Sequence, residues 1–375
     1  MEEDNKLFID KDLYLPKITE HYNTFINKSI NLYGSSNSNK STLLIKIMNI
    51  LKGYVPACIC FNMTENSNNT FKNILPDALI HTTLEIPILE AIWQRQEILT
   101  EIYKKVNNIN NIKEIIVYFD LSSYEPNISK LNIKKIEEIN NLQNKKIDKN
   151  LFLLEKSKII EKFSEIETLL TKKYLINIKD KIKNIYNKLK NNIDINKDDE
   201  DYYLKYKSLD DDKKLIIKYH NINPHLLIIF DDCAASIKPI IKSDIIRKLF
   251  YQSRHNNITF LSTYQSEIDL DASLRKNARI TILCDSNEAN SHFERASNNY
   301  SKQIKTLTRR IISKLYTQDN KYKKLVYNKD SSNQLEWMES AITESFQFCE
   351  ENVLNFINSI SKKEERSISK LIKKI

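Results

Sequence analysis

The most informative segment of the chain is Gly34-Ser35-Ser36-Asn37-Ser38-Asn39-Lys40-Ser41-Thr42. It follows Ser-Ile-Asn-Leu-Tyr at 29–33, which is typical of a short strand, and it leads into residues 41–52, whose apolar positions recur at helical spacing. A strand, a polar loop ending in Lys-Ser, and a helix together follow the phosphate-binding pattern G-x-x-x-x-G-K-[ST]. The alternative is a polar turn before a surface helix, which can arise by chance in a chain rich in Asn and Ser.

Asn39 occupies the position where this pattern has its second glycine. The chain contains only two glycines, Gly34 and Gly53, and is rich in Asn, Ile and Lys. We interpret this composition as a bias towards A/T-rich codons, which would replace glycine wherever the chemistry permits. Asn is the next most tolerant residue for left-handed backbone geometry, and its backbone N–H remains available as a donor. The loop can therefore keep its function without the second glycine.

A loop of this kind turns backbone N–H groups inwards to hold phosphate oxygens, and the helix N-terminus adds to the anion site. We expect Lys40 to reach the β- and γ-phosphates of ATP and Ser41 to bind Mg²⁺ through its hydroxyl. The predicted cofactor-binding residues are Gly34, Ser35, Ser36, Asn37, Ser38, Asn39, Lys40, Ser41 and Thr42.

Two carboxylates follow a second apolar run. Residues 226–229 are continuously apolar, as in a parallel strand buried on both faces, and Phe230-Asp231-Asp232 comes next. The carboxyl ends of such strands are where open α/β sheets bind ligands. We predict that Asp231 holds the Mg²⁺ shell and that Asp232 orients or deprotonates the attacking water. The alternative is a pair of acids that cap a helix.

A third strand, at 258–262, leads into Ser262-Thr263-Tyr264-Gln265. We predict that Gln265 senses the γ-phosphate or positions water. Arg254 precedes this strand and Arg275 follows it, and either one could act as an arginine finger on a neighbouring subunit. The alternative for both arginines is a surface or ion-pair role.

Strands alternating with helices predict an α/β fold with a mainly parallel sheet flanked by helices. A change of composition to Lys, Asn, Glu and Ile predicts a helical insertion, for which a helical hairpin is one arrangement. The domains expected are residues 1–120 and 216–345 as the two parts of an ATPase domain, 121–215 as the insertion, and 346–375 as a basic helical tail.

Some individual segments carry weaker predictions. Residues 57–61 and 278–283 are expected to be strands, and 86–106 and 151–190 helices. We further expect a strand at 115–119, a solvated turn at 198–201 and helix throughout 334–375.

Composition narrows the partners only a little. The 375-residue chain has a formal net charge of +9 and a pI of about 9.0. This favours an acidic partner such as nucleic acid, although a Lys-rich codon bias gives the same charge. Five cysteines match neither a disulfide framework nor a zinc site, and no stretch approaches the roughly 20 apolar residues that span a bilayer. The N-terminus is charged and lacks the apolar core of a signal peptide.

Taken together, the motifs resemble those of the genome-packaging ATPases of poxviruses and other large DNA viruses, within the FtsK–HerA superfamily. The matching pieces are the phosphate loop at 34–42, Leu-Leu-Ile-Ile-Phe-Asp-Asp at 226–232, Ser-Arg-His at 253–255, Thr-Tyr-Gln at 263–265 and Arg-Lys-Asn at 275–277. The family has Gly-Arg-His where this chain has Ser253-Arg254-His255, and more glycine in its phosphate loop. The resemblance covers about residues 20–65 and 215–345.

The resemblance implies a P-loop fold of the additional-strand type, in which the sensor strand lies between the strands that carry the loop and the acids. It also implies a homo-oligomeric ring that uses ATP and Mg²⁺ to move double-stranded DNA into a capsid, with capsid, portal or membrane-vertex proteins as partners. The expected location is the viral factory in the host cytoplasm, and the virion. Two alternatives remain open: a cellular or plasmid-type DNA translocase or helicase, and a catalytically inactive scaffold that binds DNA or the capsid.

Overall fold

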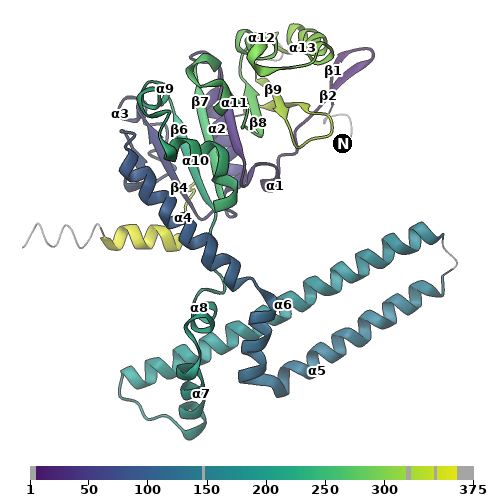
Figure 1. The fold of residues 1–375 in the computed structure, drawn as a ribbon, viewed down its shortest axis with the longest axis vertical. Coiled ribbons are helices and arrows are strands. Elements are labelled where there is room, and N and C mark those ends of the chain that lie inside the picture. Colours follow the sequence, from purple (N-terminus) through teal and green to yellow (C-terminus); the bar gives the residue numbers. More distant parts are fainter. Residues whose placement is uncertain (1–5, 146–147, 318–321, 342–343, 361–375) are drawn as a thin grey trace, which may run out of the picture. The chain divides into compact units, whose positions relative to one another are not determined.

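The computed structural model describes residues 6–145, 148–317, 322–341 and 344–360. The chain forms two compact units (Figure 1), which we call the sheet unit and the helical unit. The sheet unit combines residues 1–97 and 223–375, and the helical unit comprises 98–222. The helical unit thus begins earlier and ends later than the insertion expected at 121–215.

Eight of the described strands form one sheet in the order β10-β9-β8-β3-β7-β6-β4-β5. Strands β3 to β8 pair in parallel, while β9 runs antiparallel to both β8 and β10. The bounds are β3 Ser29–Tyr33, β4 Ala57–Asn62, β5 Ile80–His81, β6 Leu226–Asp231, β7 Ile258–Tyr264, β8 Ile280–Leu283, β9 Lys323–Asn328 and β10 Leu335–Glu339.

The position of β7 confirms a prediction about strand order. It pairs with β3, which leads into the phosphate loop, and with β6, which ends in the first acid. A mostly parallel sheet with an extra strand between those two is a P-loop NTPase fold of the additional-strand type. In register, Tyr33 lies opposite Tyr264, so the loop and the residues after β7 leave the sheet at the same edge.

Helices cover both faces of this sheet, which explains the unbroken apolar run of β6. Ile228 and Phe230 pack into one core, and Leu227 and Ile229 pack into the other. Burial on both faces is typical of parallel strands. The helices of this unit are α1 Tyr22–Phe25, α2 Lys40–Leu51, α3 Glu65–Asn68, α9 Ala234–Ile237, α10 Asp244–Gln252, α11 Ala272–Arg275, α12 Ser286–Glu294 and α13 Lys302–Leu315. Residues 351–360 are also helical.

The C-terminal part of the sheet was not foreseen. The prediction of helix throughout 334–375 is wrong for β10, which pairs with β9 in an antiparallel hairpin. Helix is found at 351–360, and residues 361–375 lie outside the described part of the chain. A small hairpin of β1 Lys6–Asp10 and β2 Leu13–Pro16 was also missed.

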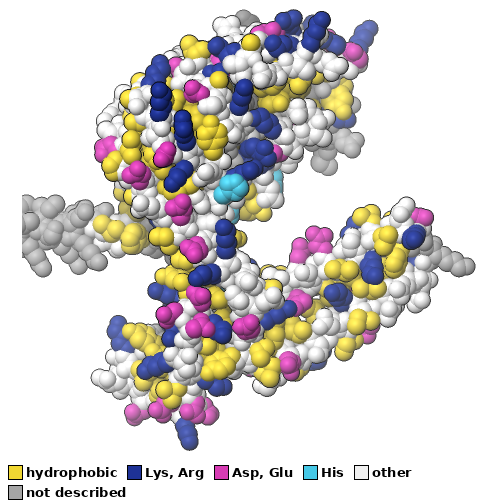
Figure 2. Space-filling model, viewed as in Figure 1, with side chains coloured by type: hydrophobic (Ala, Val, Ile, Leu, Met, Phe, Trp, Pro, Cys, Tyr) yellow, Lys and Arg dark blue, Asp and Glu magenta, His cyan; other side chains and the backbone are white. Residues whose placement is uncertain are grey.

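The helical unit is built around two long helices, α5 Ile109–Gln143 and α6 Lys149–Lys190, which pack against each other. Two shorter helices, α7 Lys197–Ser208 and α8 Asp211–Tyr219, pack against α6, and α4 Ile86–Val106 leads into the unit from the sheet unit. Its surface mixes basic, acidic and apolar side chains (Figure 2). Within the described residues, none of the helices has an apolar stretch long enough to span a bilayer.

Two local predictions in this unit are wrong. Residues 115–119 belong to α5, where Ile115, Ile116 and Phe119 point into the core of the helical unit at helical spacing. Acids 198–201 lie at the start of α7 rather than in a turn, with Asn196 accepting from the backbone N–H of Asp199 as its N-cap. Acidic residues are favourable there because they face the positive end of the helix dipole.

Candidate functional site

The phosphate loop connects β3 to α2 and has the backbone geometry that its sequence predicts. Asn37 and Asn39 both adopt left-handed conformations, with φ of 64° and 67°. Asn39 is the residue just before α2, and its side chain makes no capping hydrogen bond. Asn at this position is therefore explained by backbone conformation rather than by a side-chain contact.

Gly34 is required for space. A Cβ on this residue would lie 2.4 Å from Ser38 Oγ and 2.8 Å from Cys284 Cβ. Both distances are shorter than van der Waals contact, so the loop could close over β8 only with glycine here. The single glycine that the loop retains is thus the one that packing demands.

Lys40 is the first residue of α2, and it folds back along the loop. Its ammonium donates to the carbonyl oxygens of Gly34 at 2.5 Å and Ser35 at 2.8 Å. Ser41 and Thr42 follow in the first turn of the helix, and Ser41 is exposed. The ammonium, the Ser41 hydroxyl and the helix N-terminus therefore lie together on the loop side of the sheet edge.

The two acids lie at the end of β6, and one hydroxyl on β7 contacts both. Thr263 Oγ1 donates to Asp231 Oδ1 at 2.6 Å and accepts from the backbone N–H of Asp232 at 3.2 Å. Asp231 is 6% exposed, while Asp232 is exposed and has a left-handed φ of 53°. One carboxylate is thus buried and fixed, and the other faces solvent.

The electrostatics of Asp231 reflect its neighbours on both sides. Burial raises the pKa of its carboxyl above the ordinary value, and the nearby Asp232 adds to this rise. The hydrogen bond from Thr263 and the positive charge of Lys40 act in the opposite direction. Lys40 and Asp231 are therefore close enough to influence each other, as expected for groups that flank one ligand.

Gln265 follows β7 directly and lies beside the second acid. Its Nε2 donates to Asp232 Oδ1 at 3.5 Å, at the long limit of a hydrogen bond. The structure thus brings Lys40, Asp231, Asp232 and Gln265 to one edge of the sheet.

This arrangement suits Mg²⁺ bound together with phosphate oxygens. Mg²⁺ takes oxygen ligands and usually has only one or two from the protein, the rest coming from water and phosphates. Thr263 occupies Oδ1 of Asp231, which leaves Oδ2 as the oxygen for a metal, and the exposed Ser41 hydroxyl is the second candidate ligand. Among the described residues, no cluster of three or more His, Cys, Asp or Glu side chains forms a metal site of another kind.

Arg254 is not part of this group. It belongs to a 3-10 turn, η4 (Ser253–Asn256), that precedes β7, so it lies where the parallel strands begin and the loop lies where they end. Arg254 cannot reach a nucleotide held by the phosphate loop of its own chain. The predicted role in a neighbouring subunit is compatible with this position.

The prediction for Arg275 is wrong. Its side chain is 6% exposed, and its Nη1 donates to the carbonyl oxygens of Glu267 and Leu270, each at 2.6 Å. Nη2 donates to Ser297 Oγ at 3.2 Å. A guanidinium engaged in this way inside the unit stabilises the loop after β7 and is not available as a finger.

Sequence reasoning missed a second layer that holds the site. Asp285, the N-cap of α12, accepts from the backbone N–H of Ser35 at 2.7 Å and from its hydroxyl at 3.1 Å. One turn later, Glu288 accepts from Ser266 Oγ and from the backbone N–H of Glu267. Helix α12 thus binds both the phosphate loop and the segment after Gln265. The spacing of Asp285 and Glu288, typical of a helix N-terminus, was the available signal.

Glu267 is fully buried and is the centre of a polar network. It accepts hydrogen bonds from His292, Arg295, Asn298 and Ser291. Burial alone would raise the pKa of Glu267, but these donors outweigh it and hold the pKa at about 2. The network fixes the turn that follows β7.

Comparison with known proteins identifies relatives of this chain. It is 30% identical over 368 residues to the uncharacterized protein B354L of African swine fever virus, isolate Tick/Malawi/Lil 20-1/1983. The match covers 93% of this chain and 92% of the relative, and B354L of the Badajoz 1971 Vero-adapted strain matches equally well. This chain belongs to the B354L family. No family model matches it.

The sequence identity to solved structures is lower than the sequence identity to the B354L proteins. The genome packaging NTPase B204 from Sulfolobus turreted icosahedral virus 2, in complex with AMP, gives a TM-score of 0.37 at 11% identity, covering 86% of this chain and 98% of B204. Its complex with ATP-gammaS gives 0.35 at 12% identity, covering 84% and 98%. The strand order of its own sheet assigns the fold of this B354L family member.

The left-handed backbone at Asn39 generates a test. We expect Asn39→Gly to be at least as stable as the native protein, and Asn39→Ala to lose about 1 kcal/mol of unfolding free energy, because alanine is strained in this conformation. Chemical denaturation followed by circular dichroism measures both. Asn49→Ala, at an exposed position inside α2, is the control and should lose nothing. Equal stability of the alanine and glycine variants at position 39 would contradict the assignment.

The Glu267 network generates a pH test. Because the pKa of Glu267 is lower in the folded state than its ordinary 4.5, its charge stabilises the protein above that pH, and this contribution disappears as the pH falls towards 2. Glu267→Gln should therefore be destabilised at pH 7, and the difference from the native protein should shrink below about pH 4.5. Denaturant titrations across this range measure it, with the exposed Glu90→Gln as control. A difference that does not change with pH would contradict the role of the charge.

Proposed function

We propose that this protein is an ATPase that drives double-stranded DNA into a viral capsid. The observation that carries the proposal is the convergence of Lys40, Asp231, Asp232 and Gln265 at one edge of an additional-strand P-loop sheet. Membership of a viral protein family supports the viral context. The proposal that ATP hydrolysis drives genome packaging rests on the resemblance of the motifs to those of genome-packaging ATPases.

In the proposed reaction each group has one task. The loop amides and Lys40 would hold the β- and γ-phosphates, and Ser41 and Asp231 would hold Mg²⁺, which would supply neutralisation of phosphate charge. The exposed Asp232 orients or deprotonates water for attack on the γ-phosphorus, and Gln265, which contacts Asp232, reports the presence of the γ-phosphate.

The position of Arg254 gives a reason for a homo-oligomer. Since it lies at the opposite edge of the sheet, it can serve only a nucleotide bound by another copy of the chain. A closed ring supplies that contact to every site. Within this proposal the ring surrounds the DNA, contacts capsid, portal or membrane-vertex proteins, and acts in the viral factory of the host cytoplasm and in the virion.

Phosphate release from ATP with Mg²⁺, with and without linear double-stranded DNA, tests the proposal. We expect DNA to stimulate the native protein and expect Lys40→Ala to reduce the rate by about 100-fold or more, because a charge that stabilises the transition state is lost. Asp232→Asn should reduce it by a similar factor, since the base is lost but the size is kept. Lys11→Ala, at an exposed position of the β1–β2 hairpin, is the control.

If the native protein and Lys40→Ala release phosphate equally and only at the background rate, the proposed ATPase activity and the proposed DNA motor are both contradicted. DNA binding without hydrolysis in the same samples would instead support the inactive scaffold.

A further inference from the structure

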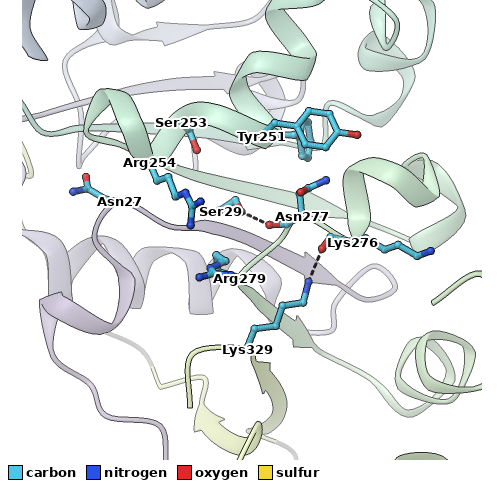
Figure 3. Close-up of a pocket in the computed structure, with 10 residues that line it drawn as sticks. Asn27, Ser29, Tyr251, Ser253, Arg254, Lys276, Asn277, Arg279 and Lys329 are labelled. Atoms are coloured by element: carbon cyan, nitrogen blue, oxygen red, sulfur yellow. Dashed lines mark hydrogen bonds between the residues drawn. The ribbon is translucent and has the colours of Figure 1, made fainter. Parts of the chain in front are cut away.

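A second cavity lies at the edge where the parallel strands begin, on the side away from the phosphate loop (Figure 3). It is lined by residues from the start of β3, the turn before β7, the segment before β8, and the end of β9. β9 contributes because it runs antiparallel to β8, so its last residues lie beside the beginning of β8. The lining residues are Asn27, Ser29, Phe250, Tyr251, Ser253, Arg254, Lys276, Asn277, Arg279 and Lys329.

The lining is strongly cationic. Four of its residues are Lys or Arg, and none is Asp or Glu. The guanidinium of Arg254 is directed towards Arg279, while the side chain of Lys276 extends away from them (Figure 3). Two guanidinium groups from separate segments of the chain thus face each other, and Lys329, from a third segment, also lines the cavity. Like charges that face each other are unfavourable unless an anion lies between them.

The nearby acid does not neutralise this group. Asp330 binds Arg279 Nη2 at 3.0 Å, but the same carboxylate also binds Lys28 Nζ at 2.9 Å. In the described part of the chain, Arg254 has no carboxylate partner, and its Nε contacts only the ring of His255, at 3.4 Å. One carboxylate is therefore shared by two cations while further cations remain.

The position and the pKa of Lys329 are consistent with the same excess of positive charge. Its ammonium donates to the carbonyl oxygen of Lys276 at 2.5 Å, which holds it at the cavity wall. Burial lowers the pKa of Lys329, and repulsion by Arg279 lowers it further, against the opposing effect of Asp330. An anion in the cavity would relieve this repulsion.

The size of the cavity restricts the anion. Its volume is 130 Å³, below the roughly 300–1,000 Å³ of pockets that hold drug-sized ligands. A single tetrahedral oxyanion suits this space, whereas a whole nucleotide does not. Guanidinium groups also match phosphate geometry through paired N–H donors.

We propose that Arg254, Arg279 and Lys329 form a binding site for one terminal or free phosphate group, separate from the phosphate loop. The inference goes beyond the proposed ATPase, because the cavity and the phosphate loop lie at opposite edges of the sheet; the two proposals share only Arg254, which the proposed ring would direct at a nucleotide of a neighbouring copy. The phosphate could come from solution or from the end of a nucleotide that reaches in from outside.

Thermal unfolding of the full chain with increasing inorganic phosphate, at an ionic strength kept constant with chloride, tests the site. We expect phosphate to stabilise the native protein. Arg254→Gln and Arg279→Gln should each weaken the apparent affinity about tenfold, the effect of losing one charge-assisted hydrogen bond. Arg247→Gln, an exposed arginine on α10 outside the cavity, is the matched control and should behave as native. Lys40→Ala should keep the response, because it alters only the loop.

The same titration with ATP in the Lys40→Ala background separates the two phosphate sources. A response to ATP that depends on Arg254 identifies a nucleotide's terminal phosphate, and a response to inorganic phosphate alone identifies the free ion; either supports the site. Affinity unchanged in both arginine variants, or lost in Lys40→Ala, would overturn it. If duplex DNA displaces phosphate and this displacement requires Arg254, the site binds the phosphates of a DNA backbone, and the proposal of a terminal or free phosphate is overturned.

Discussion

The hydroxyl of Thr263 connects the parts of the candidate site. It donates to the carboxylate of Asp231 and accepts from the backbone N–H of Asp232, so one side chain on β7 fixes the orientation of the first acid and the backbone of the second. This is possible only because β7 lies between the strand that leads into the loop and the strand that carries the acids. The insertion of one strand therefore places the loop that carries Lys40 and the acid Asp231 on either side of β7, at the same edge of the sheet.

A second constraint connects the phosphate loop to Gln265, the residue proposed to sense the γ-phosphate. Asp285 at the start of α12 binds Ser35, and Glu288 one turn later binds Ser266 and Glu267. The buried Glu267 network then fixes the other end of the same turn. A displacement of the phosphate loop would thus shift the position of Gln265 through α12 as well as through the sheet. Such a connection suits a protein in which phosphate binding must change the position of a sensing residue.

The sequence was most informative where local rules and tertiary structure agree. The loop, the acid pair and the strand that precedes Gln265 each depend on residues adjacent in the chain, and the left-handed backbone of Asn39 followed from the scarcity of glycine. Residues 115–119 were misassigned because a short apolar run satisfies both a strand and a buried helix. β10 was missed because its pairing with β9 is a tertiary contact that local sequence does not reveal. The burial of Arg275 likewise depends on its contacts with carbonyl oxygens of the loop after β7. Asp285 had a visible capping pattern, but its contact with Ser35 joins residues 250 positions apart.

A crystal structure of the protein with Mg²⁺ and a non-hydrolysable ATP analogue tests the candidate site directly. We predict that the β- and γ-phosphates lie against the backbone amides of residues 34–42 and that the metal contacts Ser41 Oγ and the carboxylate of Asp231. We further predict that the γ-phosphate lies within reach of Asp232 and Gln265. A nucleotide bound elsewhere, or a metal that contacts neither Ser41 nor Asp231, would contradict this prediction.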